Sequence, residues 1–152
     1  MKKFEFTGET KTISLLFRTA TLHRIRAVAE FGLVKIGDLG GWIEKEENLS
    51  HEGKAWVWGN AEVWGNAEVF SASHVLVIGA IGSRDDFTTF FRDKDNEITV
   101  KCGCFLGKID KFLEKVIQTH GDSKYALVYR AAVEVARLQI DLSGEAPKDA
   151  DE

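Results

Sequence analysis

A six-residue repeat in the middle of the chain constrains the fold more than any other feature. Residues 53–58, 59–64 and 65–70 follow one another without a gap, and residues 71–76 form a decayed fourth copy. The repeated columns are a small one (Ala55, Ala61, Ala67, Ser73), an aliphatic one (Val57, Val63, Val69, Val75) and a glycine one (Gly53, Gly59, Gly65). Self-similarity at a fixed period is the signature of a repeat architecture.

A repeat with this period predicts a short left-handed parallel β-helix over residues 36–79. Six residues make one flat side and one corner of a triangular coil, with the aliphatic column pointing inward and the small column inside the corner. Glycine suits the corners because it adopts left-handed backbone conformations without a steric penalty. So short a solenoid buries its core only if both ends are capped.

The segments on either side are expected to supply these caps. Residues 21–28 alternate between apolar and polar side chains, which predicts a strand paired with residues 11–18 in an N-terminal β cap over residues 1–35. Residues 37–43 look like an irregular entry turn into the coil.

The period is lost after residue 79, where a C-terminal lobe over residues 80–142 is expected. Turn-forming residues 93–96 lie between two apolar runs, which predicts a β-hairpin. Two helices should follow, separated by Gly121 as a left-handed cap and begun by Ser123. Their apolar stripes are Ile109, Phe112, Leu113, Val116 and Ile117, then Tyr125, Tyr129, Val133, Ala136 and Ile140. Residues 143–152 read as a flexible acidic tail.

The charges are unevenly distributed although the net charge is only -4. Residues 1–35 carry seven Lys or Arg against three Asp or Glu, and residues 36–70 carry two against seven. A basic patch can meet phosphate or nucleic acid, whereas two oppositely charged segments can also pack together. We favour packing, so nucleic acid is not an expected partner.

Nothing in the sequence indicates a membrane or an oxidising compartment. The chain has no apolar run of membrane-spanning length and no signal-like start, and its two cysteines, Cys102 and Cys104, are one residue apart. A cytoplasmic location follows as the simplest expectation. A C-x-C pair without further ligands does not make a metal site, so both cysteines are interpreted as small apolar residues, and no metal or cofactor is expected.

The chain resembles a family of small bacteriophage-encoded hexapeptide-repeat proteins, often described as transferase-like. The resemblance is carried by residues 6–10, 21–27, 37–44 and 48–50, the GNAxV repeats, and residues 81–84, 88–91, 101–105 and 119–122. It implies a β-helix fold and a phage or prophage origin, with the host cytoplasm as the location during infection. It does not imply a settled activity.

The junction between coil and lobe is the most attractive place for a ligand. Gly82 lets a ligand approach the backbone, and Arg84 offers a planar fork suited to phosphate. The predicted ligand-binding residues are Ser83, Arg84, Thr88, Thr89, Lys101 and His120. The alternative is a structural junction in which Arg84 pairs with Asp85 or Asp122 and the threonines are ordinary strand residues.

The aromatic residues of the repeat are predicted to form an interface between copies of the chain. They are Trp56, Trp58, Trp64 and Phe70. Flat solenoid faces often associate symmetrically, so a trimer or dimer is expected. Packing against the flanking segments is the alternative explanation.

These features favour a phage-encoded, non-enzymatic binding protein that antagonises a host defence system. It would sequester a nucleotide-type immune signal or block a host defence protein. One alternative is an acyltransferase-like enzyme, since many hexapeptide-repeat proteins transfer acyl groups with a histidine base, for which His74 is a weak candidate. Another is a structural phage component in which the coil is a stiff spacer.

Overall fold

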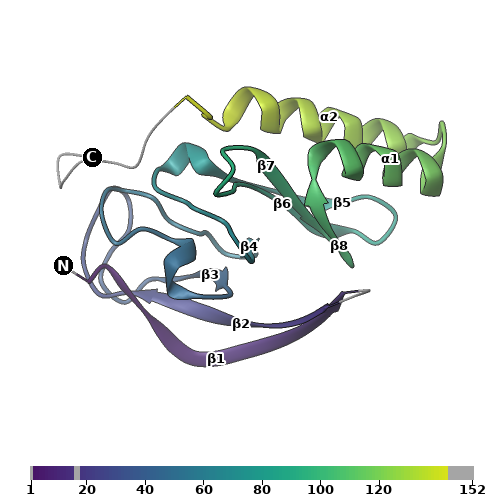
Figure 1. Ribbon diagram of the computed structural model, residues 1–152. Helices are drawn as coiled ribbons and strands as arrows, with labels where there is room; N and C mark the ends of the chain where they lie inside the picture. Colours follow the sequence, from purple (N-terminus) through teal and green to yellow (C-terminus); the bar gives the residue numbers. More distant parts are fainter. Residues whose placement is uncertain (1, 16–17, 144–152) are drawn as a thin grey trace.

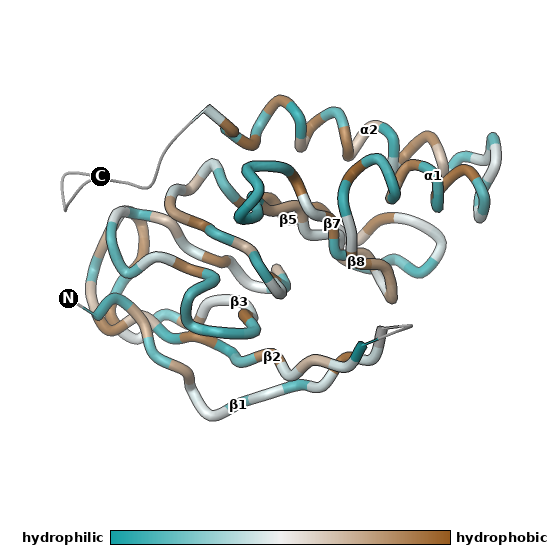
Figure 2. The backbone as a smooth tube through the Cα atoms, in the orientation of Figure 1, coloured by the Kyte–Doolittle hydropathy of each residue, from teal (hydrophilic) through white to brown (hydrophobic). Residues whose placement is uncertain are grey.

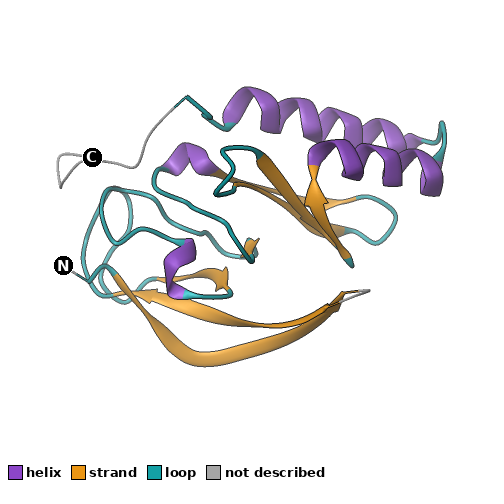
Figure 3. Ribbon diagram, in the orientation of Figure 1, coloured by secondary structure: helices purple, strands orange, loops and turns teal. Residues whose placement is uncertain are grey.

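In the computed structural model, which describes residues 2–15 and 18–143, two four-stranded sheets are followed by a pair of helices (Figures 1 and 3). The first sheet contains β1 (Phe4–Leu15), β2 (Arg18–Ala27), β3 (Leu39–Ile43) and β4 (Glu62–Val63), in that order. The second contains β5 (Val75–Ile81), β6 (Asp86–Arg92), β7 (Ile98–Cys102) and β8 (Phe105–Lys108), also in chain order. The helices are α1 (Ile109–His120) and α2 (Lys124–Gln139).

The predicted left-handed β-helix over residues 36–79 is wrong. Both sheets are open, and β1 with β2, β2 with β3 and every neighbouring pair of the second sheet run antiparallel. Among the strands of the described chain, parallel pairing is confined to β3 and β4, through Trp42 with Glu62 and Ile43 with Val63. A solenoid needs parallel pairing on successive turns, and beyond this strand pair the described residues add only an isolated parallel bridge between Leu49 and Val69.

The repeat instead forms one irregular layer whose buried alanine and valine columns share a core with the first sheet and Phe91 of β6. The alanines and valines of the first three copies are at most 2% exposed. Gly59 and Gly65 turn the chain with φ of +36° and +55°. The Gly41 N–H donates to the Val57 carbonyl at 2.7 Å on one side, while the Glu68 N–H donates to the Arg92 carbonyl at 2.9 Å on the other.

The repeat segment, residues 53–70, adds no further turn on top of itself because the chain turns away after the third copy. A short 3₁₀ turn at Ala72–His74 leads directly into β5. Val75, the aliphatic residue of the decayed fourth copy, therefore begins the second sheet. The period identified the buried side chains but not the elements that cover them.

The N-terminal hairpin is confirmed. Lys11 pairs with Leu22 and Thr12 with Thr21 in the β1–β2 register. Residues 39–43, expected within an entry turn, form strand β3 instead. There the backbone passes so close to the coil that a Cβ on Gly41 would lie 2.7 Å from the Ala61 carbonyl oxygen. Only glycine fits at that distance.

The opposite charges of the first two segments meet as expected. Lys11 lies 2.5 Å from Glu62, Arg18 pairs with Glu44, and the ammonium of Lys2 lies 3.9 Å from Glu46. These ion pairs connect β1 and β2 to the acidic coil, so complementary packing explains at least part of the charge asymmetry.

The C-terminal lobe also forms the expected elements. β6 and β7 make the hairpin around residues 93–96, and two helices follow. Gly121, with φ of +57°, ends α1 by donating its N–H to the Ile117 carbonyl. Ser123 stands at the N-cap of α2 but makes no side-chain capping bond. Apart from its first residue, Ser143, the predicted tail lies outside the described residues.

The second sheet is covered on both faces, which makes the molecule three-layered (Figure 1). Adjacent β6 residues show this directly: Phe91 packs into the core of the first sheet and coil, whereas Phe90 packs into the core beneath the helices. Both rings are fully buried. In Figure 2 the helices alternate between brown and teal along their turns, as expected for helices with an apolar side on the sheet. Neither helix has the length and apolar composition that crossing a bilayer requires.

A fully buried carboxylate, Asp93, holds the β6–β7 hairpin together. Oδ1 accepts the N–H groups of Asp95 and Glu97, and Oδ2 accepts the Thr99 hydroxyl at 2.7 Å and the Lys108 ammonium at 2.6 Å. Burial opposes the charge, but the bonds from Lys108, Thr99 and the backbone outweigh it and lower the pKa of Asp93. The nearby carboxylates of Asp95 and Glu97 also contact Lys108, at 3.1 and 3.0 Å, so its ammonium already occupies the place where a cation would be held.

Replacing Asp93 with Asn should lower the free energy of unfolding by about 3 kcal/mol, because the amide would direct a donor at Lys108 or Thr99. Since the folded-state pKa of Asp93 lies below its ordinary 3.8, the carboxylate's contribution is present above that pH and lost below it. Urea denaturation at several pH values measures both effects. The exposed control Asp95→Asn should cost less than about 1 kcal/mol. Equal effects of the two substitutions would contradict this role.

Candidate functional site

Two cavities lie on opposite faces of the second sheet. Each has a volume of about 320 Å³. The helix-side cavity lies between the sheet and the helices, and the inter-sheet cavity lies between the second sheet and the N-terminal layer. Gly103, in the turn between β7 and β8, borders both.

The helix-side cavity is built where two turns of the sheet meet the end of the helical hairpin. Its lining consists of Ser83, Arg84, Cys102, Gly103, Cys104, Phe105, Phe112, Lys115, Val116, Thr119, His120 and Tyr129. These residues come from the β5–β6 turn, the β7–β8 turn, α1 and α2. Ser83, Arg84, Cys104, Lys115 and Thr119 are exposed, so the cavity is open to solvent.

Aromatic rings form the inner wall of the helix-side cavity. Tyr129 packs edge-on against Phe112, with ring centroids 5.6 Å apart, and stacks with His120 at 5.7 Å. Phe105 lies 5.4 Å from Phe112. Gly82 accommodates Tyr129, because a Cβ at that position would lie 1.8 Å from the phenol oxygen. The wall is therefore fixed in place by close packing.

The Tyr129 phenol stays protonated at neutral pH. Burial is the main cause that raises its pKa to about 12, and the neighbouring Cys102 thiol adds to the effect. The Cys102 sulfur accepts a hydrogen bond from the Thr88 hydroxyl at 3.4 Å. The inner wall therefore carries a neutral phenol and a thiol rather than fixed charges.

Two cationic residues and a histidine, from two different elements, line the outer part of the cavity. Arg84 comes from the β5–β6 turn, Lys115 from the middle of α1 and His120 from its last residue. The lining residues include no Asp or Glu. Within the described ranges, Arg84 makes no ion pair with either Asp85 or Asp122, the partners that a purely structural junction would give it. The chemistry suits a ligand with an anionic group and an apolar body.

The structure brings together half of the predicted ligand-binding residues. Ser83, Arg84 and His120 line the helix-side cavity, whereas Thr88 and Thr89 are buried at 1% and 2% exposure. The Thr88 hydroxyl bonds Cys102, and the Thr89 hydroxyl accepts the N–H of Glu62. The threonines therefore serve the packing of the sheet.

Sequence reasoning missed several lining residues of the helix-side cavity. Lys115 and Thr119 are one helical turn apart on α1 and belong to the same face as Phe112 and Val116. That spacing was available in the sequence. Tyr129 was assigned only to the apolar stripe of α2, and its place in the cavity depends on how the two helices dock.

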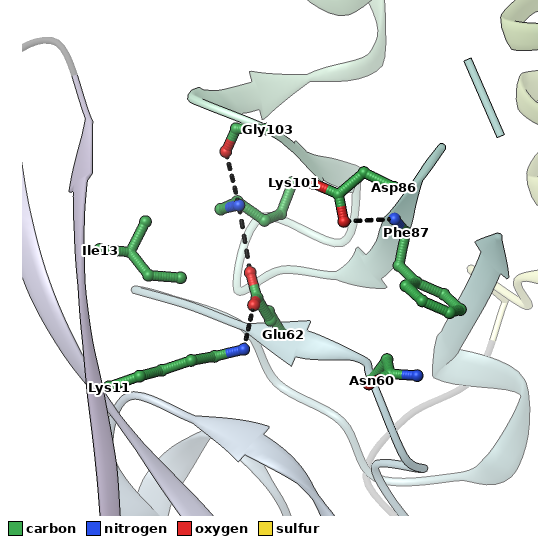
Figure 4. Close-up of a pocket in the computed structure, with 8 residues that line it drawn as sticks. All are labelled: Lys11, Ile13, Asn60, Glu62, Asp86, Phe87, Lys101 and Gly103. Atoms are coloured by element: carbon green, nitrogen blue, oxygen red, sulfur yellow. Dashed lines mark hydrogen bonds and ion pairs between the residues drawn. The ribbon is translucent and has the colours of Figure 1, made fainter. Parts of the chain in front are cut away.

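The remaining predicted ligand-binding residue, Lys101, lines the inter-sheet cavity, which Figure 4 shows. Its ammonium lies 3.1 Å from Glu62 and donates to the Gly103 carbonyl at 2.6 Å. The second Glu62 oxygen lies 2.5 Å from Lys11 on β1. One carboxylate thus joins two lysines from opposite walls, and Lys101 is only 5% exposed. We interpret this triad as a structural connection between the layers.

Glu62→Gln should lower the free energy of unfolding by about 2 kcal/mol, because it leaves the buried Lys101 ammonium without its carboxylate partner. Chemical denaturation measures the change. Glu46→Gln is the control, because the Glu46 side chain is half exposed and its partners are the exposed Lys2 and the half-buried His51; it should cost less than about 1 kcal/mol. A Glu62→Gln protein as stable as the control would show that the triad contributes little.

The predicted catalytic histidine and two of the four predicted interface aromatics are buried. His74 is 2% exposed, and its Nδ1 accepts the N–H groups of Phe70 and Ser71. Burial lowers the pKa of His74, which favours the neutral ring in this turn. Trp56 and Trp64 are buried inside the chain and offer no surface to another copy, whereas Trp58 is 49% exposed and Phe70 is half-buried.

No protein-family model and no curated protein matches this chain. The resemblance to phage-encoded hexapeptide-repeat proteins therefore stays a prediction, and the β-helix that it implied is contradicted by the strand topology.

The protonation of Tyr129 gives the helix-side cavity a measurable signature. Because its folded-state pKa is raised from 10.0 to about 12, its contribution to stability is complete below pH 10 and is lost as pH rises toward 12. Ultraviolet absorbance should show one phenolate forming near pH 12, and Tyr129→Phe should remove that step. If the variant retains it, the phenol is not held in the environment described.

Proposed function

We propose that this chain is a non-enzymatic binding protein that holds a small nucleotide-type anion in the helix-side cavity. The observation that carries the proposal is the convergence of Arg84 from the β5–β6 turn with Lys115 and His120 from α1 around a cavity with an aromatic inner wall. Cations that serve only as surface charges need not gather around one aromatic-lined cavity, whereas a site for an anionic ligand with an apolar body needs them there.

The division of the lining indicates how a ligand would be oriented. Phosphate oxygens would meet the guanidinium of Arg84 and the ammonium of Lys115 near the solvent, with Ser83 and Thr119 offering hydroxyl donors. A flat base would lie deeper, against Phe105, Phe112 and the stacked His120–Tyr129 pair. A volume of about 320 Å³ is near the lower end for small-molecule sites. Part of a nucleotide would therefore remain outside.

Binding without turnover is favoured over acyl transfer. The histidine on which the enzyme alternative depends, His74, is buried in a turn, and its Nδ1 lone pair accepts backbone N–H groups. It lines neither the helix-side nor the inter-sheet cavity. A group without access to substrate does not act as a general base.

The biological setting of the proposal rests on the resemblance alone. Phage-encoded proteins that sequester a nucleotide-type immune signal would antagonise host defence in the host cytoplasm without chemistry of their own. A cavity of this kind is sufficient for that role if the affinity exceeds that of the host receptor. Blocking a host defence protein through the protein surface is the alternative within the same setting.

Thermal unfolding with a panel of nucleoside mono- and diphosphates and cyclic dinucleotides tests the proposal. A ligand present at about 100 times its dissociation constant should raise the melting temperature by about 5–10 °C. Arg84→Gln and Lys115→Met should each remove most of that shift. Lys111→Met on the same helix is the matched control, because Lys111 is exposed and does not line the cavity.

Two results would reject the binding site. One is a panel in which no compound at millimolar concentration shifts the unfolding of the native protein. The other is an equal shift in the native and Arg84→Gln proteins. To separate sequestration from turnover, the bound compound is recovered by heat denaturation and weighed by mass spectrometry. Recovery of the intact compound supports sequestration, and recovery of a cleaved product supports an enzyme.

A further inference from the structure

Helix α2 has a second apolar stripe that faces away from the molecule. Leu127, Val135 and Leu138 are 59%, 46% and 88% exposed, and Ala131 between them is exposed as well. Their spacing of four, four and three residues places all four on one side of the helix. A nearly bare leucine within such a stripe is a common mark of an interaction surface.

The chain itself does not cover this stripe in the part that the structure describes. The opposite side of α2 packs on the second sheet and α1 through Ala126, Ala132, Val133 and Ala136, which are at most 5% exposed. Figure 1 shows α2 at the outer edge of the molecule, with the rest of the fold on one side of it. The helix is therefore apolar on two sides but packed on one.

We propose that the exposed face of α2, made by Leu127, Ala131, Val135 and Leu138, binds the same face of a second copy in an antiparallel, two-fold symmetric dimer. The proposal does not depend on the function of the helix-side cavity, since none of these four residues lines that cavity. It replaces the tryptophan-rich repeat as the expected interface, because Trp56 and Trp64 are buried inside their own chain.

The order of residues along the stripe fits a two-fold axis at Ala131. Four residues before it stands Leu127 and four after it stands Val135, so an antiparallel partner places each Leu127 against Val135 of the second copy. Ala131 faces itself at the crossing point, where a small side chain lets the two helices approach closely.

The charges beside the stripe are complementary under the same symmetry. Arg130 and Glu134 lie on the same flank of the apolar stripe, one helical turn apart. Glu134 also pairs with Arg137 of its own helix at 3.1 Å, through one of its two carboxylate oxygens. Antiparallel packing brings Arg130 of one copy within about two residues, or roughly 3 Å along the axis, of Glu134 of the other. Two symmetric Arg–Glu pairs result, whereas a parallel two-fold pair would place the two flanks on opposite sides of the interface and form no such pairs.

The expected dimer is weak because the surface is small. Sixteen residues of α2 form a rod about 24 Å long. One helix pair of that length buries less than the roughly 1,200 Å² of a stable interface. We therefore expect reversible association in the micromolar range rather than a permanent dimer.

Sedimentation equilibrium of the full chain from about 1 to 500 μM tests the proposal. The average mass should rise from the 17.0 kDa of the monomer towards twice that value. Ala131→Glu, which places two carboxylates at the two-fold axis, should weaken association at least about tenfold. Gln118→Glu on the exposed side of α1 is the control and should associate like the native protein.

A charge exchange tests the antiparallel arrangement itself. Arg130→Glu and Glu134→Arg should each weaken the dimer several-fold, and the double substitution should restore most of the affinity, because the pairs re-form with their signs reversed. All positions changed are exposed, so melting temperatures measured at low concentration should remain near the native value.

Three outcomes would overturn the proposal. The first is a monomer across the whole concentration range. The second is a dimer that Ala131→Glu leaves intact, which would place the interface elsewhere. The third is a native monomer that binds vesicles or a host protein through the α2 face, which would assign the stripe to a different partner.

Discussion

The burial of the second sheet on both faces is the constraint on which the rest of the structure depends. Neighbouring rings on β6 point in opposite directions, Phe90 toward the helices and Phe91 toward the coil, and each is fully buried. Because side chains alternate along a strand, the same division separates Lys101, which faces the coil, from Cys102, which faces the helices. The position of one cavity on each face follows from this alternation. It also separates the Lys101–Glu62 ion pair on one face from the Thr88–Cys102 hydrogen bond on the other.

Local pattern was sufficient to predict several of the separate elements. The N-terminal hairpin, the β6–β7 hairpin and both helices are seen in the structure, since alternation and helical spacing are determined within a short window. The repeat was different, because its period specifies which side chains are buried and leaves open what buries them. Val63 and Val69 share one core with Ile43 of β3 and Phe91 of the second sheet, so residues outside the repeat complete their burial.

The candidate site shows the same limit at the level of single residues. Ser83, Arg84 and His120 were found because turns and helix ends place polar groups at the surface. Thr88 and Thr89 were both assigned to one pocket, although neighbours on a strand face opposite sides, so alternation alone excluded one of them. Tyr129 and Lys115 join the cavity through the docking of α1 and α2, which no local pattern contains.

The most direct test of the central claim, that the helix-side cavity binds a nucleotide-type anion, is an amide chemical-shift titration of the isotope-labelled protein. A cyclic dinucleotide and a nucleoside diphosphate are added separately at millimolar concentration. The account predicts saturable shifts at Ser83, Arg84, Cys104, Thr119 and His120, with Asn60 and Glu62 of the inter-sheet cavity unchanged. Shifts confined to Asn60 and Glu62, or no shift with either compound, would contradict it.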